Sequence, residues 1–444
     1  MAIAKTIYID KSSDKFLLDA YNGTGGFKFG YYLVPHGRED EDDFKTRQTL
    51  AIYPNYCRKL VGVLMGFLTK DAPSREDMSD LYAQFVSNAD GQGKELDAVL
   101  FVYQRLAMIL GTVYIIVDKP TTQGDTKATE AMPYLAMRKR NQLVHECKDA
   151  CGVWDSVTFC EEVSGKTQYR TFTKTGWQIT EHENGSGVLS QGTYNLGEVP
   201  VVPLHIAEPL EPTDSECTSF YYDIAQRVWE LYNVLSEMRD QERQQAFAIL
   251  TMPYTDPSEL EKLKDITIGT KNGLPYNANG GGQPAFIAPP PDPLQHFTAR
   301  IESIKADIFS LASLEFIGNV QPSGEALSWH FTQTNSALNS MAKGFENAEN
   351  HICRLVHKWQ GQTPQGKISY PNNFNIADVK KALEIAMDSI NLNLGPVFNR
   401  TVKKLAARQV LQNDVSAQTL ADIEADIDAN GDIYGDRLQQ QAGL

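Results

Sequence analysis

Apolar positions spaced three and four residues apart predict helices in several parts of the chain. A first helix is expected after the acidic cluster at 39–43, because carboxylates are favourable at the positive end of a helix dipole. Pro54 should interrupt this helix before the pattern resumes at Tyr56. A second helix around 95–110 should stop at Gly111, where the β-branched apolar run 112–117 predicts a buried strand. Helix, glycine and strand in this order indicate an α+β region.

Residues 132–206 have a different pattern, in which short β-prone runs alternate with turns. The turn signals are Ser164-Gly165 and Asn184-Gly185. The runs are 133–137, 153–159, 168–172, 177–180 and 199–205. This pattern predicts a small antiparallel β region.

Two helical patterns, 217–249 and 294–316, bracket an insert at 250–293 that is rich in proline and glycine. The insert should hold a short helix near 258–263 and one or two strands. This order predicts a helical hairpin with a protruding tip. The first helix has an apolar stripe that must be buried, and neighbouring copies in a ring would bury it. The residues expected to make these subunit contacts are Val228, Leu231, Leu235 and Met238.

A break at 317–323 separates the hairpin from a very long helical pattern at 325–360. Gly318 frees the backbone there, Pro322 blocks helix continuation and Ser323 suits a helix N-cap. The final segment, 373–444, is predicted to be helical and becomes acidic near its end.

Composition places the chain among globular proteins, with 444 residues, 42% apolar and 22% charged. The formal net charge of −15 argues against a protein that coats duplex DNA through its phosphates. Six cysteines are too few for a disulfide scaffold, so we expect reduced thiols. The longest apolar run, between Arg105 and Asp118, is too short to span a bilayer, and the first residues do not resemble a signal peptide. We therefore expect no membrane contact and assembly inside a cell.

Three short motifs resemble sites of known chemistry. Residues 164–167 (SGKT) end like a phosphate-binding P-loop, but the glycine that should precede Gly165 by four or five residues is missing, so a hairpin turn is favoured. Residues 426–433 resemble the start of a calcium loop, but Arg437 stands where a bidentate Glu is required. An acidic turn is favoured over a calcium site, which stays the alternative. His351, Cys353 and His357 share one helix without a completing ligand, so we expect packing and no metal or other cofactor.

Several segments in order resemble the portal proteins of tailed bacteriophages. One is an acidic-then-helical opening, and another is the helix-Gly-strand-Asp-x-Pro segment LAMILGTVYIIVDKP. A third segment resembles the strand that leads into the portal stem helix. A fourth is similar to the loop and helix start at a portal tunnel, with the sequence FIGNVQPSGEALSWHFTQTN. The matching segments are 31–73, 106–120, 197–209, 221–243 and 316–335. Residues 373–444 match least well.

The resemblance implies the α+β portal fold, in a ring that usually has twelve subunits around a DNA tunnel. It implies a wing at 1–216, with its β-rich part at about 132–206, and a further wing helix and connection at 324–372. The remaining implied parts are the stem helices 217–249 and 294–316, the clip 250–293, the tunnel loop 317–323 and the crown 373–444.

The resemblance also implies a non-enzymatic conduit at one capsid vertex, through which double-stranded DNA is packaged and ejected without sequence specificity. Implied partners are the large terminase ATPase, a head–tail adaptor, and the major capsid and scaffolding proteins. The virion, with host cytoplasm during assembly, is the implied location. The implied site residues are Gly318, Asn319, Val320 and Gln321 in the tunnel loop, Tyr276 and Phe286 for clip docking, and Arg300 and Lys305 facing DNA. For these two basic residues, salt bridges and solvated faces are the favoured reading over contact with DNA.

Two alternatives belong to other classes of protein. One is a different virion ring protein, such as a head–tail connector or a minor capsid protein. The other is a packaging ATPase, which would need a complete P-loop in place of the SGKT fragment.

Overall fold

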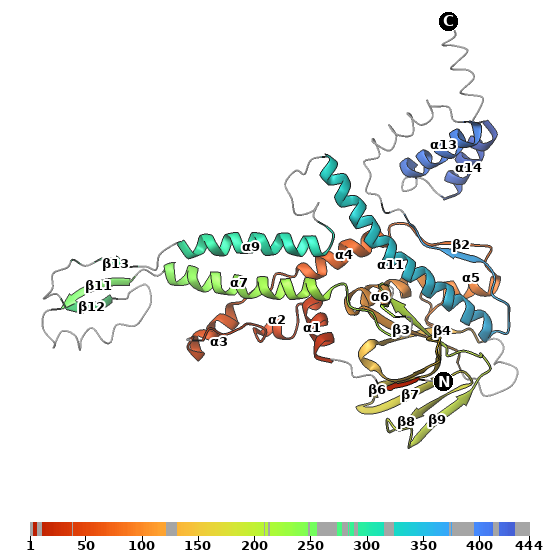
Figure 1. Ribbon diagram of the computed structural model, residues 1–444, viewed down its shortest axis with the longest axis horizontal. Coiled ribbons are helices and arrows are strands. Elements are labelled where there is room, and N and C mark those ends of the chain that lie inside the picture. Colours follow the sequence, from red (N-terminus) through yellow and green to blue (C-terminus); the bar gives the residue numbers. More distant parts are fainter. Residues whose placement is uncertain are drawn as a thin grey trace, which may run out of the picture. The chain divides into compact units, whose positions relative to one another are not determined.

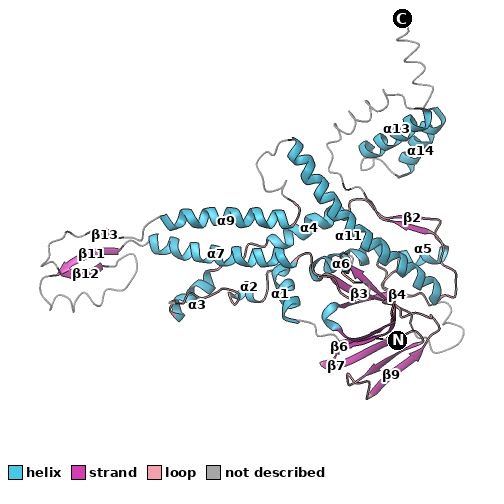
Figure 2. Cartoon of the chain, in the orientation of Figure 1, coloured by secondary structure: helices cyan, strands magenta, loops and turns pink. Residues whose placement is uncertain are grey.

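Helices and strands both build this chain in the computed structural model, so the fold is α+β, as expected (Figures 1 and 2). The chain divides into two compact units, Met1–Phe374 and Asn375–Leu444. The structure describes residues 3–6, 11–37, 39–120, 131–207, 209–211, 214–246, 249–254, 273–277, 283, 285–287, 292–314, 324–372, 374, 395–411 and 417–430.

Helices of the first unit pack their apolar faces into one large core. Side chains such as Leu17, Leu64 and Phe85 have at most 1% of their surface exposed. The long helix α11 contributes Phe345, Ile352 and other residues to the same core. Besides the two long helices described in the next subsection, the helices concerned are α1 (Lys11–Asn22), α2 (Gly26–Phe29), α4 (Tyr56–Leu68), α5 (Asp80–Ser87), α6 (Leu96–Leu110) and α11 (Gly324–Trp359).

Short polar side chains fix where several of these helices begin. Helix α3 (Glu41–Leu50) starts after Asp40, whose Oδ1 accepts a hydrogen bond from the Asp42 amide at 2.9 Å. The Asn55 side chain caps α4 in the same way, accepting from the Arg58 amide at 2.9 Å. The predicted interruption at Pro54 is therefore confirmed, since α3 ends at Leu50 and α4 begins at Tyr56.

Gly111 joins α6 to strand β3 (Thr112–Asp118), as the sequence predicts. Its φ is +89°, and a Cβ placed there would lie 2.3 Å from the carbonyl oxygen of Cys217. Glycine is therefore required both by the backbone conformation and by the close approach of the segment that contains Cys217.

Strand β3 is buried on both faces and separates two cores. It is the central strand of a sheet of order β10-β3-β4, with antiparallel neighbours β4 (Tyr134–Lys139) and β10 (Val201–His205). Because side chains alternate along a strand, Ile115 joins the large helical core while Tyr114 and Ile116 join a second core. Burial on both faces explains the unbroken apolar run in this segment.

A second sheet, of order β1-β5-β6-β7-β8-β9, supplies the other side of that second core through Val157, Phe159 and Phe172. The strands of the β-rich region 132–206 pair antiparallel, as expected, but they belong to two sheets. The region is split, because β4 and β10 pair with β3 while the other strands pair among themselves and with β1. The strands are β1 (Ile3–Thr6), β5 (Leu143–Lys148), β6 (Trp154–Val163), β7 (Lys166–Thr173), β8 (Gly176–Thr180) and β9 (Val188–Thr193).

A short two-stranded sheet joins distant parts of the sequence. Strand β2 (Ser74–Glu76) pairs antiparallel with β14 (Lys367–Ser369), placing Arg75 opposite Ile368. The chain that leaves α11 is thereby fixed to the segment between α4 and α5.

In the second unit, the structure describes helices α13 (Pro396–Leu411) and α14 (Ala417–Asn430), which pack against each other. These helices fall within the segment predicted to be helical.

Candidate functional site: the helical hairpin and its inserted strands

Two long helices, α7 (Tyr222–Ala246) and α9 (Asp292–Leu311), run antiparallel and side by side (Figure 1). With 25 and 20 residues, they are about 38 and 30 Å long at 1.5 Å per residue. The segment between them contains three short strands, so a β insertion connects the two helices at one end of the hairpin. Both long helices predicted by the sequence are present: α7 lies within 217–249, whereas α9 begins at Asp292, before 294, and ends at Leu311. Their role as stem helices stays a prediction.

The proximal half of the hairpin is held by an apolar seam. Ile301, Ile304 and Ile308 follow one another at intervals of three and four on α9 and are buried. They join the same core as Val228 and Leu231 of α7. Burying each such side chain is worth roughly 1.5–3 kcal/mol, so this seam fixes the pairing of the two helices.

The other side of α7 is hydrogen-bonded to the segment that follows α2. The indole Nε1 of Trp229 donates to the carbonyl of Tyr32 at 2.6 Å. One turn later, the amide oxygen of Asn233 accepts from the Val34 amide at 2.9 Å. These bonds satisfy backbone groups of an irregular segment and hold the first turns of α7 rigidly against the body.

The distal half of the hairpin is different, because none of its described side chains is fully buried. This holds for the described side chains of 237–246 on α7 and 294–300 on α9. Two helices bury little of their apolar surface against each other. A helical hairpin therefore needs further neighbouring elements to bury the rest.

A charged cluster lies across the hairpin beside a polar groove. The carboxylate of Glu230 accepts hydrogen bonds from Arg227, at 2.7 Å, and from Arg300 on the opposite helix. Burial raises the pKa of Glu230, but these two guanidinium groups outweigh it, and the net pKa is lowered. The groove has a volume of about 610 Å³. Its charged lining residues are Arg227, Asp223, Glu230 and Asp307, so it is acidic overall.

The inserted strands form a three-stranded sheet of order β12-β11-β13. Its strands are β11 (Ile249–Tyr254), β12 (Gly273–Asn277) and β13 (Phe286–Ile287). Strand β11 is parallel to β12 and antiparallel to β13. Phe286, predicted to dock partners, is 73% exposed, and Tyr276 is half-buried. The predicted helix near 258–263 lies outside the described residues.

The structure corrects part of the predicted subunit contact. Val228 and Leu231 have 0% of their surface exposed in the single chain, so they belong to its own core and offer no surface to another subunit. The apolar stripe in the sequence could not distinguish burial in the chain's own core from contact with another subunit, because both require apolar residues at the same spacing. Leu235 and Met238 lie further along α7 and are only partly buried. For these two residues the subunit contact stays a prediction.

The two basic residues predicted to face DNA both have carboxylate partners within the chain. Arg300 pairs with Glu230, and Lys305 pairs with Glu302 at 2.9 Å. The tunnel-loop residues Gly318, Asn319, Val320 and Gln321 lie outside the described residues.

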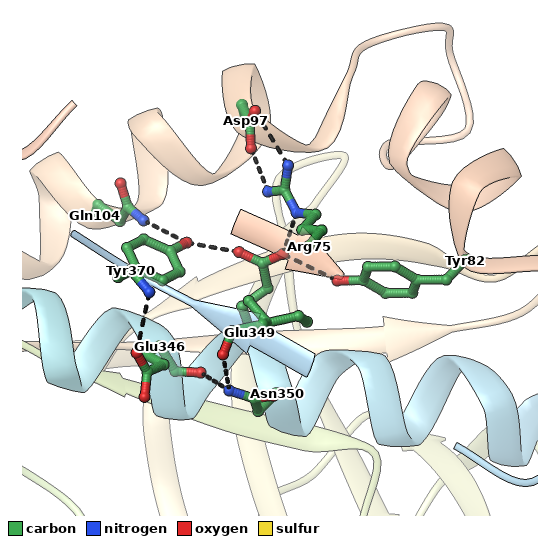
Figure 3. A network of polar contacts seen from close by, with 9 residues as sticks. Arg75, Tyr82, Asp97, Gln104, Glu346, Glu349, Asn350 and Tyr370 are labelled. Carbon is green, nitrogen blue, oxygen red and sulfur yellow. Dashed lines mark hydrogen bonds and ion pairs between the residues drawn. The ribbon is translucent and has the colours of Figure 1, made fainter. Parts of the chain in front are cut away.

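A buried polar network, which the sequence did not reveal, fixes α11 to the body (Figure 3). Glu349 has no exposed surface. Its carboxylate accepts from Arg75 Nε at 2.6 Å and from the hydroxyls of Tyr370 at 2.7 Å and Tyr82 at 3.2 Å. Burial and the Glu349 carboxylate raise the pKa values of both tyrosines far above their ordinary value. The partners lie more than 260 positions away or beyond the end of α11, so no local pattern could have indicated them.

A second carboxylate joins α11 to the segment before β10. Glu198 lies 2.7 Å from Lys358 Nζ, 2.9 Å from Arg354 Nη2 and 3.4 Å from His351 Nε2. Burial raises the pKa of Glu198, but the hydrogen bonds from these three groups lower it far more. His351, considered above as a metal ligand, thus faces a carboxylate.

The remaining motifs also have structural roles. Ser164 and Gly165 form the hairpin turn between β6 and β7, with φ values of +53° and +76°, and a strand follows, so this segment is not a P-loop. His357 is buried between Ser79 Oγ and the Cys353 carbonyl, each 2.8 Å from a ring nitrogen. Asp426 and Asp428 lie inside α14, while positions after 430 are outside the described residues. Within the described ranges, no group of three or more candidate ligands is placed to hold a metal ion.

Comparisons with known proteins give distant likenesses only. No protein-family model matches the chain, and no curated protein matches it. A chain of "Virion of native gene transfer agent (GTA) particle" is similar over 95% of both chains, with 11% identity and a TM-score of 0.47. A chain of "Neck of native GTA particle computed with C12 symmetry" covers 86% of this chain and 90% of its own, with 11% identity and a TM-score of 0.45. A chain of "Neck of empty GTA particle computed with C6 symmetry" covers 95% of both, with 12% identity and a TM-score of 0.44.

Helices long and apolar enough to cross a membrane are absent from the part of the chain that the structure describes.

Proposed function

We propose that this chain is the subunit of a ring-shaped portal in a tailed-phage-like virion, which conducts double-stranded DNA during packaging and ejection. The observation that carries the proposal is the α7–α9 hairpin with strands inserted at its end, rooted in an α+β body. This is the order of stem and clip that the sequence resemblance implies. The proposal makes the chain a non-enzymatic conduit, placed at one capsid vertex after assembly in the host cytoplasm.

The uneven burial of the hairpin supports assembly into a ring. Its proximal half has a complete apolar seam, but the described side chains of its distal half are all at least partly exposed. Side-by-side copies around an axis would cover these surfaces, because each hairpin then has a neighbour on both sides. Leu235 and Met238, at the transition between the two halves, are the residues proposed to contact the next subunit.

The charge of the chain suits a tunnel through which DNA slides. Each phosphate neutralised by a protein cation releases counterions and strengthens binding, so a wall rich in free cations would retain DNA. Twelve chains at −15 each would carry roughly −180. Arg300 and Lys305 already have carboxylate partners, which weakens their attraction for phosphate. In this proposal the segment 317–323, which carries no charge, is the loop nearest the DNA.

The inserted strands are the proposed docking site for the terminase ATPase during packaging and for a head–tail adaptor afterwards. Phe286 is a large apolar side chain with 73% of its surface exposed, which is typical of a contact residue. The capsid and scaffolding proteins are the further partners that this role requires.

Electron microscopy and native mass measurement of the purified chain test the proposal. We expect a ring of about twelve subunits with an axial hole, and no ATP hydrolysis by the ring alone. A chain that stays monomeric at all concentrations would contradict the proposal. ATP turnover would favour a packaging ATPase, and a ring that joins virions only after DNA is packaged would favour a head–tail connector.

A further inference from the structure

Strand β9 is an edge strand that lacks the usual protection against further pairing. It ends the sheet order β1-β5-β6-β7-β8-β9 and pairs with β8 alone (Figure 2). Its sequence, VLSQGT, contains no charged residue and no proline, the residues that commonly keep an edge from pairing. Val188 and Leu189 are 52% and 48% exposed. With six residues at about 3.4 Å each, β9 offers roughly 20 Å of open edge.

The register with β8 identifies the backbone groups on the open side of β9. The Tyr194 amide donates to the Thr175 carbonyl at 2.9 Å, just beyond the end of the strand. In an antiparallel ladder, residues bonded to the partner strand alternate with residues whose N–H and C=O point away from it. The groups of Gln191 and Thr193 therefore point away from β8, whereas those of Ser190 point toward it. No backbone hydrogen bond to another described residue satisfies the outward groups.

The same edge has an aromatic surface. Trp177 of β8 pairs with Gly192 of β9, and a Cβ placed on Gly192 would lie 2.7 Å from the indole Nε1. The half-buried indole thus lies across β9 at the position where the strand has no side chain of its own. A strand added beside Gly192 would contact this indole, because aromatic side chains cover glycines in paired strands.

Strand β1 is the other edge of this sheet. It pairs with β5 alone, with Ile3 opposite Lys148 and Thr6 opposite His145. Every neighbouring pair of the sheet is antiparallel. Because strand direction then alternates across all six strands, β1 and β9 run in opposite directions. A second sheet placed edge to edge in the same orientation would therefore bring its β1 antiparallel to β9.

We propose that β9 of one copy pairs antiparallel with β1 of the next copy, so that the six-stranded sheets of neighbouring subunits join. The inference rests on the proposed ring and names a contact within it. A second copy is the occupant because every chain carries both edges, and their directions match in a head-to-tail arrangement, which closes into a ring. Pairing of β9 with another β9 would instead give dimers and leave β1 open.

Proline substitutions distinguish the open side of β9 from its paired side. Gln191→Pro removes an outward N–H, a change that an edge strand tolerates, and places the proline ring against an incoming strand. It should dissociate at about tenfold higher subunit concentration than the wild type, measured by native mass and sedimentation. The thermal midpoint of the dissociated chain should stay the same.

Two further variants serve as controls. Gln191→Thr keeps the outward N–H and a residue that suits strands, so it should assemble like the wild type. Ser190→Pro removes an N–H that faces β8, so it should lower the thermal midpoint of the dissociated chain itself.

Hydrogen exchange identifies the strand that covers the edge. In the wild-type ring, the amides of Gln191 and Thr193 should exchange at least about tenfold more slowly than in the dissociated chain, and exchange should also slow within Ile3–Thr6. The Ser190 amide should change little, because it is bonded within the chain in both states. In Gln191→Pro, the slowing within Ile3–Thr6 should be reduced.

Other outcomes would overturn the inference. Rings in which the amides of Gln191 and Thr193 exchange as fast as in the dissociated chain would show that the edge stays open, while the proposed ring itself stands. Slowing in β9 without slowing in β1 would assign the edge to a different segment. Slowing that occurs only in complete particles would assign it to another virion protein. A wild-type chain that never assembles would contradict the proposed ring and this contact with it.

Discussion

Buried carboxylates with several donors are the residues on which the position of α11 depends. Glu349 has no exposed surface, and it receives hydrogen bonds from Arg75, Tyr82 and Tyr370. A buried charge is tolerated only when it is paired and hydrogen-bonded, so removing one member leaves the others without partners. Glu198 acts similarly nearer the surface, where the side chains of Arg354, Lys358 and His351 of α11 surround it.

Replacing Glu349 with Ala should lower the free energy of unfolding by about 3–5 kcal/mol, because Arg75 and two tyrosine hydroxyls lose a buried partner. Asp97→Asn is the control, since Asp97 also pairs with Arg75 but its side chain is 51% exposed. We expect the control to cost less than about 1 kcal/mol in urea unfolding. Equal losses in the two variants would contradict the assigned role of Glu349.

The ion pairs of Glu198 should make stability depend on pH in the acidic range. The folded state lowers the pKa of Glu198 from its usual value of 4.5, so the stabilisation is present above that value and is lost as pH falls through the folded pKa. Glu198→Gln should therefore be less stable than the wild type by about 1 kcal/mol at pH 7, a figure reduced for the exposure of Arg354 and Lys358. The difference should shrink in urea titrations below pH 4.5. A difference that stays constant down to pH 2 would exclude this pair as its source.

At the scale of elements, α7 changes environment along its length. Its first turns lie between the body and α9, where Val228 and Leu231 are fully buried. From about residue 237 onward its described side chains are at most half-buried, and the inserted strands follow. One helix thus has a part that is buried within its own chain and a part whose described side chains stay at least partly exposed.

Leu235→Asp should disrupt rings while leaving the chain folded, because Leu235 lies at the transition and is only partly buried. Val228→Ala is the contrasting variant, since its side chain is fully buried and its truncation leaves a cavity. It should lower the free energy of unfolding by about 1–3 kcal/mol and leave ring size unchanged. Native mass and urea unfolding distinguish the two. Intact rings of Leu235→Asp would contradict the proposed contact. In a separate test, a reducing agent together with a chelator should leave the wild-type ring intact.

Phe286→Ser should leave ring assembly unchanged and reduce the DNA packaged per capsid, because the side chain is 73% exposed and adds little to the inserted sheet. Tyr276→Ser tests the half-buried neighbour, where some loss of local stability is also expected. Particle counts and packaged DNA are the measurements. Loss of rings with Phe286→Ser would instead assign this residue to the subunit contact.

At the scale of the whole molecule, every buried apolar side chain among the described residues belongs to the first unit. Ile368 is the last fully buried apolar residue among those described, and the unit boundary follows at Phe374.

A chain ending at Phe374 should unfold in one cooperative urea transition, within about 1 kcal/mol of the full chain. The reason is that no described core residue is removed. Circular dichroism and tryptophan fluorescence should report the same midpoint. A broad or missing transition would mean that residues 375–444 stabilise the first unit directly.

Local sequence determined the elements whose signals are also local. Asp40, Asn55 and Gly111 fix helix ends through contacts or backbone angles within a few residues, so these boundaries were predictable. The same holds for the turn at Ser164-Gly165 and for the hairpin of long helices around a proline- and glycine-rich insert. Strands β1, β2, β5, β9 and β14 were missed. Strands β1, β2 and β14 have only three or four residues each, and β5 and β9 lack a clear alternation of buried and exposed positions.

Only the tertiary structure decided which surface each apolar or charged residue meets. Val228 and Leu235 share one helical stripe, yet the first is enclosed by the body and α9 while the second is not. Similarly, the strands of 132–206 look alike in sequence but belong to two sheets. Glu349 and Arg75 are separated by 274 residues, and no pattern within either segment selects the other. Periodicity gives the direction of a side chain relative to its own element, whereas its partner depends on how distant elements pack.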